Sequence, residues 1–283
     1  MRCSANMFRV IFAAFFVFVS TASAKPKRIV STNVCADQLV LLLAERESIL
    51  SISKLASEPE ISNFAEIATG YKANSARAEE IIELKPDLVV GDIQTGRHAN
   101  ALAKAMGVPV HLVGWPASIA DVTNIIREAG RVLDEEAKAA HIINQMQARI
   151  ANARALVGSP VTALVYEPNG LTTGNGTLTD DILKAAGLTN IAPKLTQASY
   201  GSVPLERVVA AAPQMLVLDD SYGGSSSRAQ SILRHPAFAS LDGRTTRVSI
   251  PSRLWLCPGP WVAEAVERLA SQRRQLSPSL APN

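Results

Sequence analysis

Aromatic and polar residues recur at or just past the ends of predicted strands, where open α/β sheets bind their ligands. These residues are Asn33, Trp115, Tyr166, Tyr222, Arg253, Trp255 and Trp261. Aromatic faces with a few hydrogen-bonding groups suit a large, flat or partly apolar ligand, and an arginine would favour an anionic one. Singly, each residue is more often a packing residue. Together they favour a binding cleft, and the first six form the predicted ligand-binding set.

Residues that could support catalysis or hold a metal are sparse by comparison. The sequence has no G-x-S-x-G elbow, no P-loop and no H-E-x-x-H motif, so no catalytic residue is predicted. Residues 174–177, which read Gly-Asn-Gly-Thr, are interpreted as a turn that leads into a helix. No metal site is predicted because metal-ligand spacing is absent among the four histidines, which are His98, His111, His141 and His235.

One spacing occurs in each half of the chain. Glu79 stands seven residues before Pro86, and Glu206 stands seven residues before Pro213. In both copies a short helical stretch fills the gap, and a strand of the buried type follows and ends at an acidic residue. The copies are 127 residues apart, which is too long for a solenoid repeat of about 20–50 residues. The spacing therefore predicts two similar lobes, with a ligand held in the cleft between them.

Strands alternate with helices of about ten residues, which predicts an α/β fold with mainly parallel sheets flanked by helices. Strands are expected at 28–31, 49–52, 88–90, 108–113, 161–166 and 248–250. Helices are expected at 33–43, 99–106, 118–133, 134–157, 177–186 and 261–272. The polar stretch 53–76, broken by Pro59 and Gly70, is expected to be a loop that lines the cleft.

The segment 134–157 lies between the two copies of the repeat and contains neither proline nor glycine. As one helix it would be about 36 Å long, roughly the length of a small domain. Its position favours a rigid connector over an ordinary core helix. The predicted organisation is an N-terminal lobe at 25–130, a connecting helix at 131–158, a C-terminal lobe at 159–276 and a disordered tail at 277–283.

The N-terminus has the pattern of a secretory signal peptide. Arg2 and Arg9 precede or flank an apolar run at 10–19, and residues 22–24 offer a small-x-small cleavage site. The run is shorter than the about 20 residues of a permanent span. We therefore expect a mature chain that starts at Lys25, outside the cytoplasm, with 26 basic against 25 acidic side chains once two arginines are removed. That near-neutral balance, without a basic stripe, argues against nucleic acid as a partner.

Two cysteines survive this cleavage, Cys35 and Cys257. An exported chain lives in an oxidising compartment, so unpaired thiols there need an explanation. Two readings stay open at this point: two buried small hydrophobic side chains, or a disulfide that joins the first and last segments of the fold.

The order and spacing of these segments resemble the periplasmic iron-chelate/cobalamin-binding family, the helical-backbone solute-binding proteins of ABC importers. The resemblance covers nearly the whole mature chain. Its best-matching stretches are 79–90, 107–113, 205–218 and 254–269. It implies two Rossmann-like lobes joined by a single long α-helix, a ligand held between the lobes, and little hinge motion. It also implies a periplasmic location and a monomer that works with an ABC permease dimer in the inner membrane.

The resemblance assigns roles to the two repeated glutamates and leaves the ligand open. A glutamate on each lobe of such proteins docks onto arginines of the permease, and the corresponding residues here are Glu79 and Glu206. Iron–siderophore complexes, haem and cobalamin all use this fold, and no resident cofactor is expected. Haem proteins of this type usually supply an axial tyrosine or histidine, for which Tyr166, Tyr200 and His98 are candidates.

A different class of protein is kept as the alternative: a secreted α/β enzyme with its active site in the same cleft. Its only acidic candidates are Asp92, Asp219 and Asp220. No partnered histidine or serine accompanies them, which argues against catalysis.

Overall fold

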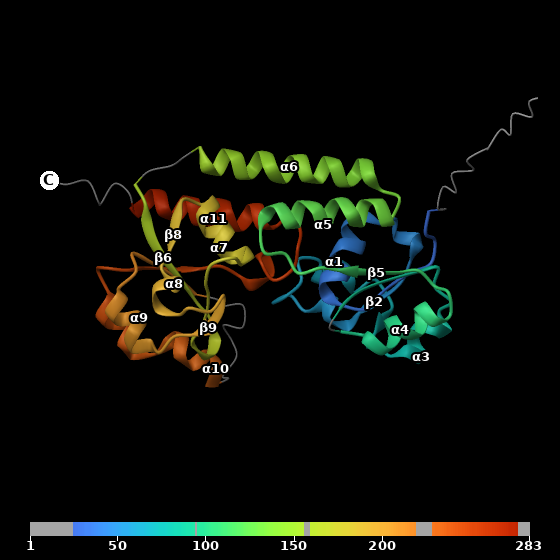
Figure 1. Cartoon of the computed structure of the whole chain (residues 1–283), viewed down its shortest axis with the longest axis horizontal. Helices are drawn as coiled ribbons and strands as arrows, with labels where there is room; N and C mark the ends of the chain where they lie inside the picture. Colours follow the sequence, from blue (N-terminus) through green and yellow to red (C-terminus); the bar gives the residue numbers. More distant parts are fainter. Residues whose placement is uncertain (1–24, 94, 156–158, 219–227, 277–283) are drawn as a thin grey trace, which may run out of the picture.

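The computed structural model describes residues 25–93, 95–155, 159–218 and 228–276 (Figure 1). The predicted signal peptide and the predicted tail lie outside the described residues, as does Tyr222. None of the described helices is long and apolar enough to cross a membrane.

The first lobe contains a five-stranded sheet whose neighbouring strands all run parallel, in the order β3-β2-β1-β4-β5. This is the strand order of the Rossmann fold. Its strands are β1 (Ile29–Ser31), β2 (Ile49–Ser53), β3 (Ala73–Asn74), β4 (Leu88–Asp92) and β5 (Val110–Val113). The accompanying helices are α1 (Val34–Leu43), α2 (Ala65–Ala68), α3 (Ala78–Glu83), α4 (Arg97–Ala105), η1 (Arg46–Ser48) and η2 (Lys54–Ser57). All five residues of β4 are buried, as expected for a strand covered on both faces.

The second lobe contains a four-stranded parallel sheet in the order β11-β10-β6-β8 and a separate antiparallel pair, β7 and β9. Its strands are β6 (Val161–Tyr166), β7 (Leu171–Thr173), β8 (Leu188–Asn190), β9 (Tyr200–Ser202), β10 (Met215–Leu218) and β11 (Thr246–Ser249). Its α-helices are α7 (Leu178–Ala185), α8 (Ala192–Leu195), α9 (Leu205–Ala211), α10 (Arg228–Ser231) and α11 (Val262–Leu276). Its 3-10 helices are η3 (Pro168–Gly170), η4 (Ile232–Arg234), η5 (Pro236–Leu241) and η6 (Ser252–Leu254). The prediction of two lobes with mainly parallel sheets is confirmed.

Two helices, α5 (Ile119–Val132) and α6 (Glu136–Arg154), follow the first sheet and precede the second. Figure 1 shows α6 along the top of the molecule, above α5 at one end and α11 at the other. Lys138 donates to the Leu43 carbonyl of α1 at 3.0 Å, and Arg149 pairs with Glu267 of α11 at 2.6 Å. The helix therefore contacts both lobes. The predicted domain boundaries, and the role of this one helix as the sole connector, stay predictions.

One buried apolar cluster extends through both lobes and the helices between them. It includes Leu39 of α1, Ile126 of α5, Ile143 of α6, Ile182 of α7 and Leu269 of α11. Because the lobes share this core, their separation would expose apolar side chains to water.

The predicted loop at 53–76 is the main error in the expected elements. It contains η2, α2 and β3, and β3 extends the first sheet by pairing with β2. These elements are short, so polar residues and the breaks at Pro59 and Gly70 hide them from a periodicity analysis.

The repeated spacing corresponds to a repeated structure. Glu79 and Glu206 are each the second residue of a short helix, α3 or α9. The residue before each proline has a left-handed backbone, with φ of 47° at Lys85 and 39° at Ala212. This conformation is costly for a residue with a Cβ atom. The same strained turn thus leads into β4 in one lobe and into β10 in the other.

Candidate functional site

A cavity of about 160 Å³ lies between the lobes and is lined by residues from both. The first lobe contributes Trp115 and Pro116, which follow β5. The second lobe contributes Glu167, Thr173, Leu178, Thr179 and Tyr200, and the segment around η6 contributes Trp255 and Leu256. Trp115, Pro116 and Glu167 follow the parallel strands β5 and β6, at the carboxyl ends where open α/β sheets bind ligands.

Three aromatic side chains dominate this cavity and differ in exposure. Trp115 is 56% exposed and Tyr200 is 68% exposed, whereas Trp255 is 7% exposed. The enclosed volume is smaller than the about 300–1,000 Å³ of typical ligand pockets. A large ligand would therefore cover the exposed faces of Trp115 and Tyr200 and insert only part of its structure into the cavity.

The β7–β9 pair positions Tyr200. Tyr200 lies directly opposite Thr173 in this antiparallel pair, so the two side chains share one face. The Gly174 amide donates to the Ser199 carbonyl at 2.7 Å, and the side-chain amide of Asn190 donates to the Thr173 carbonyl at 3.0 Å. These bonds fix the edge of the cavity that belongs to the second lobe.

The segment that contains Trp255 is fastened to the first lobe. Asn63 and Arg253 exchange two hydrogen bonds: the Asn63 side-chain amide donates to the Arg253 carbonyl at 2.8 Å, and the guanidinium donates to Asn63 Oδ1 at 2.9 Å. Cys35, at the start of α1, forms a disulfide with Cys257, with the Cα atoms 5.0 Å apart. Of the two readings left open for the cysteines, the disulfide is the one observed.

Arg253, a predicted ligand contact, has a partner within the protein, and its contact with a ligand stays a prediction. Its guanidinium is engaged by Asn63, whose amide groups also donate to Gln38 Oε1 at 2.8 and 2.9 Å. This network holds the η6 segment, which immediately precedes Trp255, against the first lobe. In the described structure it does not line the interlobe cavity.

Asn33, likewise a predicted ligand contact, is a helix cap. Its Oδ1 accepts from the Cys35 amide at 2.7 Å and caps α1, while its Nδ2 donates to Thr95 Oγ1 at 2.9 Å. The sequence signal that favours ligand binding, an asparagine just past a strand, is equally the signal of an N-cap.

Tyr166 belongs to the core. It is fully buried, its hydroxyl donates to the Val203 carbonyl at 3.0 Å, and its ring packs edge-on against Phe238. Burial raises the pKa of this hydroxyl, and the charge of Glu206 adds to the shift. The deprotonated form that would bind iron is therefore disfavoured, and Tyr166 is set aside as a ligand contact and as an axial ligand.

Trp261 is also a packing residue. Its indole nitrogen donates to the Cys257 carbonyl at 2.8 Å, and its ring packs edge-on against Phe64. Of the seven aromatic and polar candidates, only Trp115 and Trp255 line the cavity within the described part of the chain.

Sequence reasoning missed the polar residues of the cavity. Thr173 lies in the three-residue strand β7, Thr179 lies in a predicted helix but was not considered as a cavity residue, and Tyr200 was considered only as an axial ligand for haem. The adjacent threonines at 172 and 173 were the available signal, because β-branched residues favour strands.

The two predicted docking glutamates lie on the surface. Glu79 and Glu206 are both exposed, and each is nine residues before the strand that follows it, at positions 88 and 215. In Figure 1, α3 and α9 both lie on the side of the molecule away from α6. The described structure thus presents one exposed carboxylate per lobe, at equivalent positions.

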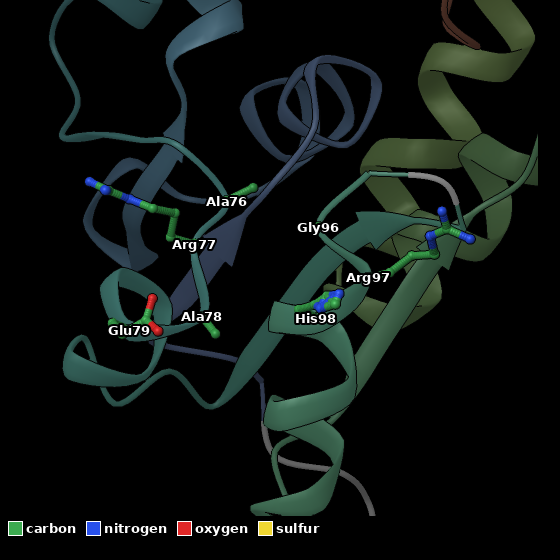
Figure 2. A pocket seen from close by; sticks show the side chains of 7 residues that line it. All are labelled: Ala76, Arg77, Ala78, Glu79, Gly96, Arg97 and His98. Carbon is green, nitrogen blue, oxygen red and sulfur yellow. The ribbon is translucent and has the colours of Figure 1, made fainter.

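A second and wider hollow, of about 550 Å³, surrounds Glu79. It is lined by residues 76–79 and 96–98, all from the first lobe. Figure 2 shows Glu79 on α3 and His98 on the neighbouring α4 at this hollow. His98 therefore lies beside a predicted docking residue, and it is not among the residues that line the aromatic cavity.

Of the three acidic candidates of the alternative enzyme, Asp92 alone lies within the described residues. Asp92 is buried, and its Oδ1 accepts from the Thr95 hydroxyl at 2.7 Å, which stabilises a turn. Asp219 and Asp220 lie outside the described residues. Among the described residues, no group of three or more His, Cys, Asp or Glu side chains could hold a metal ion.

Comparisons with known proteins agree with this geometry. The periplasmic binding protein family model matches residues 29–247. A cobalamin-binding protein of Halobacterium salinarum is 23% identical over 262 residues, which is 89% of this chain and 70% of that protein. Among solved structures, the apo periplasmic heme-binding protein RhuT from Roseiflexus sp. RS-1 has a TM-score of 0.73 at 25% identity, covering 89% of this chain and 99% of RhuT. The periplasmic vitamin B12 binding protein BtuF of Vibrio cholerae has a TM-score of 0.66 at 16% identity, covering 88% and 97% of the two chains.

Proposed function

The chain belongs to the periplasmic binding protein family, and we propose that it captures a metal chelate between its two lobes for an ABC importer. The chelate is an iron–siderophore complex, cobalamin or haem. After removal of the signal peptide, the monomer carries this ligand through the periplasm to the permease dimer in the inner membrane.

One observation supports this proposal above the others: the interlobe cavity flanked by Trp115 and Tyr200. Both side chains are more than half exposed, although large aromatic side chains are usually buried. They come from different lobes and are positioned at one cavity. Two aromatic faces that a ligand can cover suit a planar or partly apolar chelate.

Intrinsic fluorescence tests this assignment, because Trp115 and Trp255 line the cavity and Trp261 does not. Titration with ferric siderophores, haem and cyanocobalamin should quench the emission for the cognate ligand alone. Trp115→Ala and Tyr200→Ala should each weaken that binding by at least tenfold, since stacked aromatic contacts are lost. Ile67→Ala is the matched control, as Ile67 is similarly exposed at 54% but lies on α2, away from the cavity. Unchanged affinity in both aromatic variants would refute the placement of the ligand.

We also propose that Glu79 and Glu206 dock the loaded protein onto the permease. Two carboxylates at equivalent positions of two lobes suit a partner that is itself a two-fold symmetric dimer. Complementary charge at such a contact sets orientation and association rate more than affinity. Neither glutamate lines the aromatic cavity, so docking and ligand binding are expected to be separable.

A further inference from the structure

The hydroxyl of Thr173 is buried without a partner at the wall of the interlobe cavity. Thr173 is 4% exposed, and its Oγ1 makes no hydrogen bond to any group in the described part of the chain. The neighbouring threonines behave differently: Thr172 Oγ1 donates to the Val165 carbonyl at 2.7 Å, and Thr177 Oγ1 donates to the Gly174 carbonyl at 2.9 Å. Buried polar groups are normally hydrogen-bonded, so the exception needs an explanation.

The position of Thr173 in the β7–β9 pair supplies that explanation. Thr173 lies opposite Tyr200, and directly opposed side chains of an antiparallel pair project from the same face. Both residues line the cavity. The Thr172 side chain projects from the other face, where its hydroxyl is satisfied by β6. The unpartnered hydroxyl is therefore on the ligand's side of the strand.

The rest of the lining restricts the chemistry of the group that could meet this hydroxyl. Glu167 is the one charged residue among the described lining residues, which include no lysine, arginine or histidine. A carboxylate that entered the cavity would lose its hydration without gaining a counter-charge, which is costly. A neutral carboxamide or hydroxyl loses less hydration free energy on entering the cavity, and it can donate a hydrogen bond to the threonine hydroxyl or accept one from it.

We propose that Thr173 is a specificity-determining residue that hydrogen-bonds a neutral polar group, above all a carboxamide, on the inserted part of the chelate. This inference rests on the proposed function and narrows it. A chelate with carboxamide arms, as in corrinoids, is preferred over a chelate whose inserted arms are carboxylates, as in haem. Thr179, which also lines the cavity at 7% exposure, provides a second hydroxyl nearby.

Isosteric substitution separates this role from a structural one. Thr173→Val removes the hydroxyl and keeps the shape, so it should weaken cyanocobalamin binding about three- to tenfold, the effect of one lost hydrogen bond. Its melting temperature should not fall, because no hydrogen bond within the protein is lost. Thr173→Ser should restore the affinity. The matched control Thr172→Val breaks the bond to Val165, so it should lower the melting temperature and leave the affinity unchanged.

The probes are cyanocobalamin, a derivative with one peripheral carboxamide hydrolysed to the acid, and haem. Fluorescence titration should rank them in that order of affinity for the unaltered protein. If cyanocobalamin binds equally to the unaltered protein and to Thr173→Val, or if the acid or haem binds more tightly than the amide, the role of Thr173 is refuted while chelate binding stands. If the unaltered protein binds no chelate, including ferric siderophores, the proposed function fails together with this inference.

Discussion

Replacement of Asp37 by asparagine should make the protein more stable at neutral pH and leave its stability in acid nearly unchanged. Asp37 is fully buried in the first turn of α1. Its carboxylate accepts from the Ser53 amide at 3.0 Å and from the Ser53 hydroxyl at 2.5 Å. Asp180, which is also buried, pairs with Lys184 at 2.6 Å, whereas these two partners of Asp37 are uncharged groups. Burial therefore dominates at Asp37 and raises the pKa of its carboxyl to about 7, although the Ser53 bonds oppose the shift.

The direction and size of the effect follow from this pKa. The unfolded chain releases the proton near the ordinary pKa of 3.8, whereas the folded protein holds it up to about pH 7. Between these values the native state binds more protons, so the free energy of unfolding falls as the pH rises through this window. At 1.36 kcal/mol per pKa unit, the contribution of this one group declines by about 4 kcal/mol between pH 4 and pH 8. Asp37 thus lowers the free energy of unfolding only at pH values at which its buried carboxyl must ionise.

Urea unfolding at pH 4.5 and pH 8 measures how the free energy of unfolding depends on pH in the variant and in the unaltered protein. In Asp37→Asn the side-chain oxygen can still accept from the Ser53 amide, and its NH2 can donate to the Ser53 hydroxyl. The difference between the variant and the unaltered protein should therefore be small at pH 4.5 and grow to several kcal/mol in favour of the variant at pH 8. Asp242→Asn is the control for the loss of a carboxyl group as such, since that side chain is 68% exposed and pairs with Arg247 at the surface. An Asp37→Asn variant that is destabilised to the same extent at both pH values would refute the reasoning.

Three further substitutions have defined outcomes. Cys35→Ser with Cys257→Ser should lower the free energy of unfolding by about 2–5 kcal/mol, because the disulfide joins residues 222 apart in the chain. The double variant should also bind the chelate more weakly, because the Trp255 segment is released, and equal affinity in titrations would contradict this second expectation. Glu79→Lys with Glu206→Lys should abolish uptake while ligand affinity stays normal, since attraction to the permease becomes repulsion; normal uptake, or a parallel loss of binding, would exclude docking. Ala212→Gly should raise the free energy of unfolding by about 0.5–1 kcal/mol in urea melts, because the backbone φ of 39° at this position is strained for alanine and accessible to glycine. A less stable variant would show that the turn is unstrained.

Local patterns predicted the elements of this fold well. Buried runs such as 88–90 and 161–166 are strands, and Ser118 and Thr177, the first residues of two predicted helices, accept hydrogen bonds as N-caps in the structure. These features depend on neighbours within a few residues, so the sequence contains their causes. The prediction of a loop at 53–76 was wrong because a two-residue strand such as β3 forms only through its pairing with β2.

The candidate site could be predicted only in part, because its residues are positioned by distant partners. Trp255 lines the cavity since its segment is bonded to Asn63 and to Cys35, which are about two hundred residues earlier in the chain. Arg253 and Tyr166 have the residue types of ligand contacts, yet Arg253 donates to Asn63, 190 residues earlier, and Tyr166 donates to Val203, 37 residues later. Residue type and strand position alone do not distinguish a side chain that meets a ligand from one that meets the protein.

The two predicted surfaces of this protein differ in symmetry, and that difference explains why one was visible in the sequence. The proposed docking residues Glu79 and Glu206 repeat, together with the strained turns at Lys85 and Ala212, and such repetition is what a two-fold symmetric permease would require of the two lobes. A single ligand bound between the lobes does not require the same residues from each lobe. Its cavity is lined by Trp115 and Pro116 of the first lobe, and by the β7–β9 pair and the disulfide-anchored segment of Trp255 from the second half of the chain, where the antiparallel pair has no counterpart in the described first lobe. Internal repetition thus identifies the surface proposed for the partner, and the departures from repetition identify the surface proposed for the ligand.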